Sequence, residues 1–365
     1  THMMMGPSSR ANLSVGFIVS WPLYGRGDNG STPPKYVLQL KGSRLMQTEA
    51  RRIQGKDGIS LHLWVWSPDD ILDAKGVIQL LHGQGEYSGR YEHVAQYLTD
   101  RGFIVYANDH RGHGLTVFEP SEDAREGQLI PGHMADEDGW NKCLADIGII
   151  RDIIRSEQPA LPFVLMGHSL GSLMVQDVLI ADSTRWDAAV LLGSTGGPLT
   201  LQQRAIEVVV QLQYWIKGKR GAATWTDKLV MEAFAKEIDM KEYRSEWLSH
   251  DPEVIMAAEN DPMMNFSASA QHWVDLAKAI KSRARPENIA KVRKDIPLWI
   301  ASGGKCPMGR GGVGVEGLRQ GYENAGLQDV TMKLYEGMHH ELQNEVIRDE
   351  FLADLGAWLQ AKTGV

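Results

Sequence analysis

Apolar runs that end near glycine alternate with helical patterns along most of the chain. Helices are predicted where apolar positions recur at three- and four-residue steps, at 90–98, 140–156 and 170–181. The other apolar runs are continuous and of strand length, typical of strands buried on both faces. They are "GVIQLLHG" (76–83), "FIVYAND" (103–109), "PFVLMG" (162–167), "AAVLLG" (188–193) and "IPLWIASGG" (296–304). This alternation predicts an α/β fold with a mostly parallel central sheet and helices on both faces.

The alternation is interrupted once. From 198 to 285 the pattern is helical, with many Trp, Met and Leu residues and few strand candidates. We therefore expect 47–197 and 286–365 to form one core, with 198–285 inserted after the sixth strand as a helical cap. The core is expected to open with a hairpin that turns at 56–58. Residues 1–46, rich in Gly, Pro and Ser, are expected to form an irregular N-terminal arm whose first residues remain from cloning.

Composition narrows the classes of function. The 365 residues are 43% hydrophobic and 23% charged, as in globular proteins, and a net charge of −8 leaves no basic footprint for nucleic acid. The two cysteines, Cys143 and Cys306, argue against a disulfide scaffold and for a reducing compartment. No apolar run reaches the roughly 18 residues that span a bilayer. The apolar stretch 11–24 is short and broken, so we expect a cytoplasmic protein rather than an exported one.

A serine stands between two glycines directly after a predicted strand. The segment Gly167-His168-Ser169-Leu170-Gly171 matches G-x-S-x-G and precedes a predicted helix, which is the context that this motif requires for a nucleophile. The glycines let strand and helix pass closely, and the helix N-terminus directs free N–H groups toward an oxyanion. A chance match in an ordinary loop is the alternative, which the flanking strand and helix disfavour.

A serine hydroxyl needs a base, and the oxyanion needs two donors. In this arrangement the base follows the last strand, and "VTMKLYEG" is followed by His339 and His340, of which we choose His340. One backbone donor is expected from Leu170. The other is expected from Gln84 in the "HGQG" loop after an early strand, although an ordinary tight turn would also explain those glycines.

Several segments together resemble the monoacylglycerol lipase / lysophospholipase branch of the α/β-hydrolases. They are "HGQGEYSGRY", "ANDHRGHG", "GHSLGS", "EWLSHDP" and "LYEGMHHELQNE". The resemblance, which runs from about residue 47 to the C-terminus, implies the α/β-hydrolase fold and a serine esterase that acts on small acyl esters. It implies Ser169 as nucleophile and His340 as base, since the family's histidine directly precedes the final Glu of its "EGxxHE" pattern. The family's oxyanion donors correspond to Gln84 and Leu170.

The resemblance also implies which residues form the polar end of the site. Glu86 and Arg90 in "GEYSGRY", together with His168, are expected to contact the substrate there. Tyr87 stands where the family usually has His. A structural ion pair beneath the loop is the alternative role for Glu86 and Arg90, and both roles stay open.

One departure from the family concerns the triad acid. After the seventh strand the family usually reads G-x-x-D-P, and this chain reads "GGKCP", so Cys306 stands at the acid position. Cys306 could orient His340 in a weaker dyad, a carboxylate from elsewhere could take over, or the cysteine could have been introduced by substitution. A neutral thiol is a weak acceptor, but a thiolate beside an imidazolium would be a stronger partner. The carboxylates nearest in sequence are Glu316, Glu336 and Glu341.

The cap is expected to set the substrate. Its segment "AIEVVVQLQYWIKGKR" (205–220) is apolar first and basic at its end, which fits either a roof that transiently contacts a membrane surface or a helix packed on the core. Monoacylglycerols, lysophospholipids and other small esters stay open as substrates. We expect no metal and no organic cofactor. A second class of function is a degenerate hydrolase that binds an acyl ligand with little turnover, because the carboxylate is missing.

Overall fold

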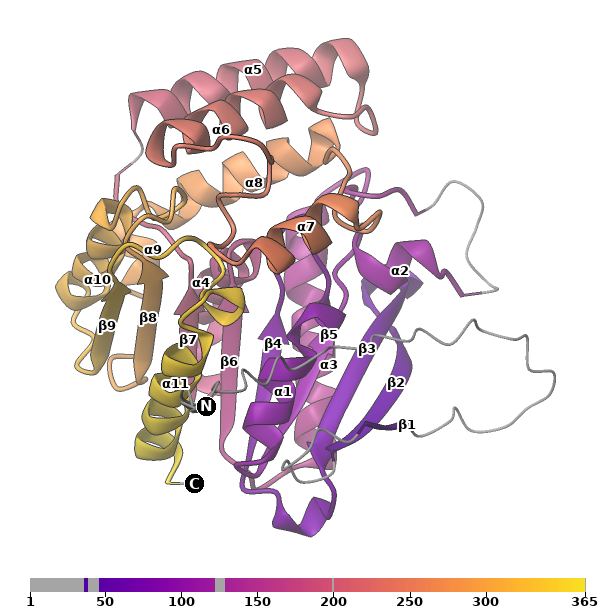
Figure 1. Cartoon of the computed structure of the whole chain (residues 1–365), viewed down its shortest axis with the longest axis vertical. Helices are drawn as coiled ribbons and strands as arrows, with labels where there is room; N and C mark the ends of the chain where they lie inside the picture. The colour runs from indigo at the N-terminus through magenta and orange to yellow at the C-terminus, as the bar shows by residue number, and fades with distance from the viewer. Residues whose placement is uncertain (1–35, 39–45, 122–128, 199, 365) are drawn as a thin grey trace, which may run out of the picture. The chain divides into compact units, whose positions relative to one another are not determined.

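A twisted sheet forms the centre of the protein (Figure 1). The computed structural model describes residues 36–38, 46–121, 129–198 and 200–364, which all lie in one compact unit. Within these ranges nine strands pair in the order β1-β2-β3-β5-β4-β6-β7-β8-β9. The strands are β1 (Tyr36–Leu38), β2 (Met46–Gln54), β3 (Ser60–Pro68), β4 (Gly76–Leu81), β5 (Phe103–Asn108), β6 (Phe163–His168), β7 (Ala188–Leu192), β8 (Leu298–Gly303) and β9 (Val330–Tyr335).

The neighbouring strands β5, β4, β6, β7, β8 and β9 run parallel to one another. The strands β1, β2 and β3 extend the sheet beyond β5 with antiparallel pairing. The prediction of a mostly parallel sheet is therefore confirmed. The predicted hairpin is the pair β2–β3. Its turn contains Asp57 and Gly58 with φ of 61° and 78°, the left-handed conformation that Asp and Gly tolerate in tight turns.

The expectation of an irregular arm over 1–46 does not hold for Tyr36–Leu38. These residues form β1, which pairs with Met46–Thr48 at the edge of the sheet. The two segments satisfy each other's backbone hydrogen-bonding groups, which composition alone does not reveal. The rest of the predicted arm, 1–35 and 39–45, lies outside the described residues.

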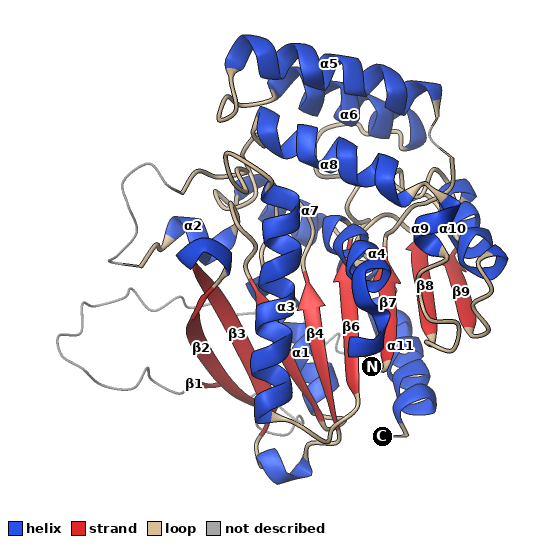
Figure 2. Cartoon of the chain, turned by 180° about the vertical axis from the view of Figure 1, so that it is seen from behind, coloured by secondary structure: helices blue, strands red, loops and turns tan. Residues whose placement is uncertain are grey.

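Helices cover both faces of the sheet, because alternate residues of each strand face opposite sides. On β6, Phe163 and Leu165 belong to one buried cluster, and Val164 and Met166 belong to the other. The helices on the first face are α3 (Gly139–Glu157), α4 (Leu170–Asp182) and α10 (Val313–Asn324) (Figure 2). Those on the second face are α1 (Glu92–Thr99) and α11 (Arg348–Thr363). A short helix, α2 (Gly114–Phe118), follows β5.

The segment between β7 and β8 is helical, as the sequence predicts. It lies beyond the ends toward which the strand arrows point (Figure 2). Ligands of α/β sheets bind at these carboxyl ends. Its helices are α5 (Leu201–Lys217), α6 (Thr224–Glu237), α7 (Pro252–Asn260), α8 (Ala270–Arg283) and α9 (Pro286–Ile289). Among the described residues, no helix combines the length and apolar character needed to cross a membrane.

Substitution by alanine is expected to change the stability of the fold in opposite directions at two glycines inside helices. In Gly171→Ala the new Cβ would meet the backbone of Leu81 and His82 at the end of β4, and overpacking of this kind costs about 1–3 kcal/mol. In Gly321→Ala the nearest atom would be 3.5 Å away, and removal of a helical glycine stabilises by about 0.5–1 kcal/mol. Urea unfolding of both variants measures the two effects. Equal stabilisation by both would contradict the close approach of α4 to β4.

Candidate active site

Ser169 forms the turn between β6 and α4 by itself. Its φ is 51°, in the left-handed region that residues other than glycine rarely adopt. Such strain persists only where the surroundings enforce it, and it is concentrated at functional sites. The N–H of Ser169 donates to the carbonyl of Leu192 at 2.9 Å. A Cβ on Gly167 would lie 2.5 Å from the carbonyl carbon of Gly171, so the turn requires glycine on both sides.

The loop after β4 passes directly beside this turn. A Cβ on Gly83 would lie 3.0 Å from Cβ of Ser169, which explains the glycine in that loop. Gln84 and Leu170 line the same cavity as Ser169. Leu170 opens α4, and the first N–H groups of a helix have no partner within the helix. The assignment of Gln84 and Leu170 as oxyanion donors stays a prediction with which this placement agrees.

The loop after β9 brings His340 to the serine side of the sheet. His340 is 1% exposed, its Nδ1 lies 3.0 Å from Sγ of Cys306, and its Nε2 has no hydrogen-bond partner within the part of the chain that the structure describes. Its ring packs against Trp247 of the cap at 4.8 Å between centroids. The Ser169 hydroxyl contacts Sδ of Met308 at 3.5 Å. The bond between serine and base is therefore open here, as is common before substrate binds.

None of the three carboxylates considered as a substitute acid bonds to His340. Glu316 is bound by an arginine of its own helix, and Glu336 is exposed. Glu341 is held through both oxygens by a buried arginine. The side chain at Nδ1 of His340 is the buried thiol of Cys306.

The surroundings of Cys306 favour negative charge on its sulfur. Burial raises the pKa of the thiol, but the attraction and hydrogen bond of His340 lower it. Hydrogen bonds from the Gly309 N–H and the Ser302 hydroxyl add to this lowering, and the net pKa lies below its ordinary value. Cys306 is therefore better suited to accept a hydrogen bond from an imidazolium than an ordinary buried cysteine would be.

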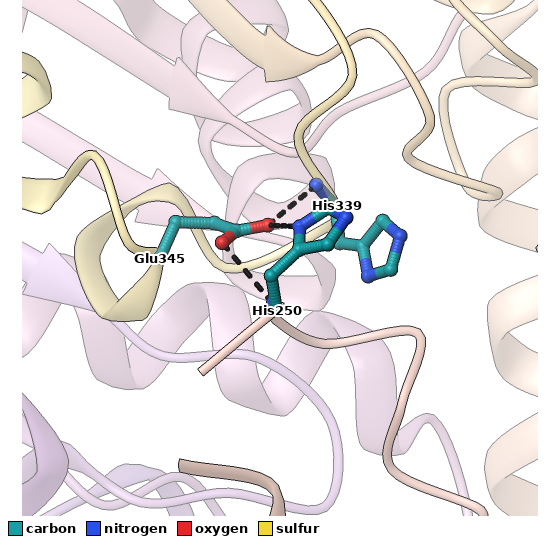
Figure 3. A group of neighbouring side chains, drawn as sticks. All are labelled: His250, His339 and Glu345. Carbon is teal, nitrogen blue, oxygen red and sulfur yellow. Dashed lines mark hydrogen bonds and ion pairs between the residues drawn. The ribbon is translucent and has the colours of Figure 1, made fainter. Parts of the chain in front are cut away.

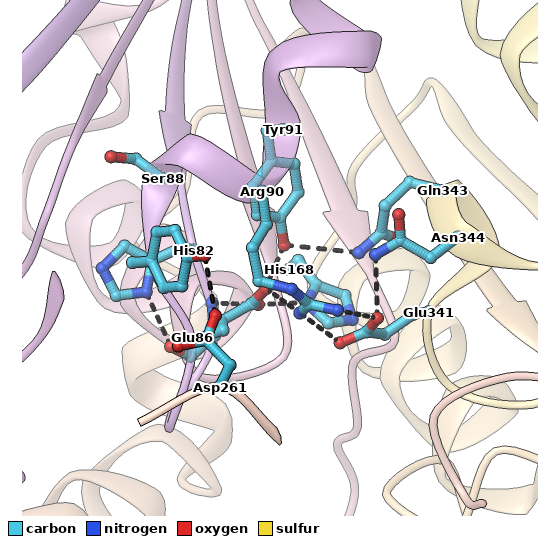
Figure 4. Close-up of polar contacts among 12 residues, drawn as sticks. His82, Glu86, Ser88, Arg90, Tyr91, His168, Asp261, Glu341, Gln343 and Asn344 are labelled. Carbon is cyan, nitrogen blue, oxygen red and sulfur yellow. Dashed lines mark hydrogen bonds and ion pairs between the residues drawn. The ribbon is translucent and has the colours of Figure 1, made fainter. Parts of the chain in front are cut away.

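A buried carboxylate, Glu86, lies at the centre of a polar network beside the turn (Figure 4). Its Oε1 accepts hydrogen bonds from the Gly83 N–H at 2.6 Å and from the Tyr91 hydroxyl at 2.9 Å. The same oxygen lies 2.7 Å from Nδ1 of His168. Its Oε2 accepts from Arg90 at 2.9 Å.

This network joins three loops. Arg90 donates two bonds of 2.7 Å to Glu341, which directly follows His340. Nε2 of His168 lies 3.4 Å from the backbone carbonyl oxygen of His340. Glu86 and His168 line the cavity, but Arg90 does not. The guanidinium of Arg90 forms ion pairs with the carboxylates of Glu86 and Glu341. This arrangement supports the structural ion pair as the role of Arg90 rather than the predicted contact with substrate.

The charged side chains of this network stabilise one another's ionised forms. Burial lowers the pKa of His168, but Glu86, Glu341 and the His340 carbonyl together raise it by more, and the net pKa is raised. Burial likewise raises the pKa of Glu86, and the positive charges of His168 and Arg90 hold it well below its usual range. The contact between Glu86 and His168 beside Ser169 therefore favours the charged form of each partner.

A cavity of about 540 Å³ opens above Ser169 and His340. Its floor is formed by the core, and its walls come from the cap. The apolar cap residues in the wall are Ile206, Val210, Val230, Met231, Phe234, Trp247, Leu248, Met264, Phe266, Trp273, Leu276 and Ile280. A largely apolar wall above a nucleophile and a base is suited to bind an acyl chain.

The comparisons with known proteins agree with this geometry. The family model described as serine aminopeptidase, S33 matches residues 73–347. The chain belongs to this family. It is 27% identical over 309 residues to a monoacylglycerol lipase of Mycolicibacterium smegmatis, covering 84% of this chain and 94% of that protein. It is 24% identical to human monoglyceride lipase, covering 84% and 89%.

Solved structures confirm the predicted α/β-hydrolase fold. A thermostable carboxyl esterase from Bacillus coagulans, crystallised with glycerol, superposes with a TM-score of 0.76 at 25% identity, over 87% of this chain and 99% of that chain. Monoglyceride lipase from Saccharomyces cerevisiae, in complex with a substrate analogue, superposes with a TM-score of 0.64 at 18% identity, over 87% and 95%. The predictions of a monoglyceride lipase-like resemblance and of a hydrolase are thus confirmed.

Sequence reasoning missed two contacts of this S33 hydrolase site. Met308 touches the Ser169 hydroxyl, and its place in the "GGKCPM" run was the available signal. The Tyr87 hydroxyl donates to Asp261 of the cap at 2.8 Å. No local pattern signals that bond, because its partners lie 174 residues apart.

Four buried histidines of the S33 hydrolase lie around the loop that follows β4: His82, His110, His113 and His272. Nε2 of His82 accepts the N–H of His110 at 3.0 Å, a bond that only an unprotonated nitrogen can accept. Nε2 of His272 lies 3.1 Å from Oε1 of Gln84. Burial lowers the pKa of His113 to about 4, and burial together with neighbouring histidines lowers those of His110 and His272 to about 3.

These histidines predict acid sensitivity of the fold. In the unfolded chain His110, His113 and His272 take up protons near their ordinary pKa of 6.5, and in the folded chain only near 3–4. Stability is therefore complete above pH 6.5 and is lost as the pH falls toward 4, by about 1.4 kcal/mol per pH unit for each such proton. Urea unfolding at pH 7, 6 and 5 measures the slope. His113→Asn, whose amide can still donate to the Arg111 carbonyl, should reduce the slope by up to one proton, and an unchanged slope would contradict this account.

Proposed function

We propose that this protein is a serine esterase that cleaves small acyl esters through an acyl-enzyme on Ser169. The observation that carries the proposal is the strained Ser169 turn at the floor of the cavity, next to a buried His340 whose Nε2 is unpartnered. In an ordinary loop nothing would sustain that backbone strain.

The proposed reaction has two steps. Ser169 attacks the ester carbonyl while Nε2 of His340 takes its proton, and the N–H groups of Gln84 and Leu170 hold the oxyanion. The alcohol leaves with the proton from His340, and water then hydrolyses the acyl-enzyme with the same base. These steps use only side chains and backbone groups of this chain.

Cys306 takes the place of the triad acid in this proposal. Its sulfur lies 3.0 Å from Nδ1 of His340, which keeps the proton on Nδ1 and leaves Nε2 free to act as the base. A thiol stabilises the imidazolium less than a carboxylate does, so the base is weaker than in an intact triad. A degenerate hydrolase that binds an acyl ligand with little turnover is the second candidate, and the missing carboxylate favours it.

The proposed substrate class is a monoacyl ester with a small polar alcohol, such as a monoacylglycerol or a lysophospholipid. The apolar cap wall suits one acyl chain, and the floor of the cavity is polar at Ser169, His168 and Glu86. The names of the relatives and the glycerol bound to the Bacillus coagulans esterase support the same class.

Substitution of Cys306 tests the proposal. Cys306→Asp restores a carboxylate beside Nδ1 of His340 and is expected to raise kcat, by at most the about 10⁴-fold that separates a carboxylate from a neutral group in a serine protease triad. Cys306→Ser, which is similar in size but cannot take up the negative charge that the surroundings of Cys306 favour, should fall below the parent rate. The measurement is burst and steady-state hydrolysis of p-nitrophenyl acyl esters of several chain lengths.

Ser169→Ala serves as the control for this assay and should remove the burst. If Ser169→Ala retained the parent rate, the nucleophile assignment would be wrong. If neither the parent nor Cys306→Asp formed an acyl-enzyme, the binding-only candidate would replace the esterase. A parent that is already fast and is unchanged by Cys306→Asp would show that the carboxylate is not needed at this position.

We further propose that the cap contacts membrane surfaces transiently. Large apolar side chains of α5 are exposed on one side of the helix, at seven-, four- and three-residue steps. They are Leu201, Val208, Leu212 and Trp215, with Ile216 beside them. Apolar residues exposed along one face of a helix, with basic residues at its end, favour the interface of anionic lipids.

Vesicle binding tests this contact. Trp215, which is 80% exposed, is expected to insert into the interface, so Trp215→Ser should weaken co-sedimentation with anionic phospholipid vesicles and leave hydrolysis of soluble esters unchanged. Leu72→Ser removes an equally exposed apolar side chain away from the cap and should bind as the parent does. Equal binding of all three proteins would remove the support for a membrane face on α5.

A further inference from the structure

Three potential metal-binding side chains cluster beside the His340 loop, outside the residues that line the cavity (Figure 3). His250 lies on the cap just before α7, His339 directly precedes His340, and Glu345 lies just after the 3-10 turn η5 (Leu342–Asn344). One ligand atom from each lies within 4.8 Å of the others. The imidazole rings of His250 and His339 stack at 3.8 Å between centroids.

The carboxylate of Glu345 is buried without a permanent cation. Its exposed fraction is 0%, and within the described residues its only ion-pair partner is His250, at 2.8 Å. Its oxygens also accept the N–H groups of His339, His250 and Val346. Backbone N–H groups stabilise a carboxylate but carry no full positive charge, so the site retains a buried negative charge.

The two histidines are prepared to act as ligands. Nδ1 of His339 lies 2.8 Å from the carbonyl oxygen of Glu246, which can only accept, so Nδ1 carries a proton. The backbone carbonyl of Ser249 also lies beside this ring, and Nε2 offers a lone pair to an ion in the neutral tautomer that the Glu246 contact favours. A backbone carbonyl that orients a histidine in this way is typical of metal sites. His250 is 42% exposed, so an ion can approach from solvent and the ring is free to adjust.

We propose that His250, His339 and Glu345 bind a divalent transition-metal ion of the zinc class. Two imidazole nitrogens, one carboxylate oxygen and a water are a ligand set that Zn²⁺ accepts. Bonds to zinc of about 2.0–2.2 Å require the ligand atoms to approach more closely than in the empty arrangement, and the exposed ring of His250 supplies that movement.

A bound ion would fasten the cap to the loop that carries His340. The cap segment 246–250 already lies along this loop, since the N–H of His340 donates to Trp247 at 3.3 Å and that of Glu341 donates to Leu248 at 2.8 Å. The ion would add bonds from His250 on one side and His339 on the other. The expected consequence is stabilisation of the folded chain, because ligands that bind only the folded state raise its stability.

Calorimetric titration of the chelator-treated full chain with ZnCl₂ tests the site. We expect one saturable ion per chain, together with a rise in the thermal unfolding midpoint that saturates with it. His250→Asn and His339→Gln should each weaken the affinity by at least about tenfold, as loss of metal-site partners does. His93→Gln, which changes a histidine outside the cluster, should bind as the parent does.

Cys306 and His340 form another nitrogen–sulfur pair that zinc could occupy, and Cys306→Ser separates the two sites. Binding that survives His250→Asn but disappears in Cys306→Ser would place the ion at the active site and overturn the proposal. Absence of saturable binding by the parent would overturn it as well. His250 is partly exposed, so its substitution should disturb folding less, and His250→Asn decides the test if His339→Gln does not fold. None of these readouts depends on esterase activity.

Discussion

The close passage of α4 over the end of β4 is the constraint on which the site depends. Gly171 lies against the backbone of Leu81, where no side chain fits, and this contact places the start of α4 beside the loop that follows β4. Ser169 must then turn within one residue, which forces its left-handed φ. The apolar residues of α4 that pack on the sheet supply the free energy that holds the strain. The same packing therefore both stabilises the fold and positions the candidate nucleophile.

A second constraint is the buried charge beside this turn. Glu86, His168, Arg90 and Glu341 are largely removed from water, which is costly for each charge taken singly. The cost is offset because every carboxylate oxygen of Glu86 and Glu341 has a donor within 3 Å. Loss of one partner would leave the others uncompensated. The hydrogen bonds and ion pairs of this network are all formed when the three loops lie as they do here. These are the loop positions that the proposed chemistry requires.

The His340 loop is where this chain departs from a carboxylate triad. Two glutamates, Glu341 and Glu345, lie close in sequence to His340, yet both are committed elsewhere, to Arg90 and to the N–H groups of the loop. Among the described residues, the side chain that reaches Nδ1 is the thiol of Cys306, and its lowered pKa favours the negative charge that a carboxylate would otherwise supply. The same loop carries His339 on its other side. One short segment therefore connects the proposed base to the cap and to the proposed metal site.

The sequence by itself determined the alternation of strands and helices, the hairpin, the helical insertion and the Ser169 turn, because these follow from local periodicity and from glycine at fixed offsets. It left the roles of Glu86 and Arg90 open and missed β1. Only the tertiary structure decided that Arg90 bonds Glu341, 251 residues away, that Cys306 rather than a glutamate meets His340, and that His250 meets His339. Such contacts depend on strand order and on where the cap folds back. Strand order and the position of the cap produce no periodic pattern in the sequence, because each is set by the packing of many apolar residues that are distant in the chain.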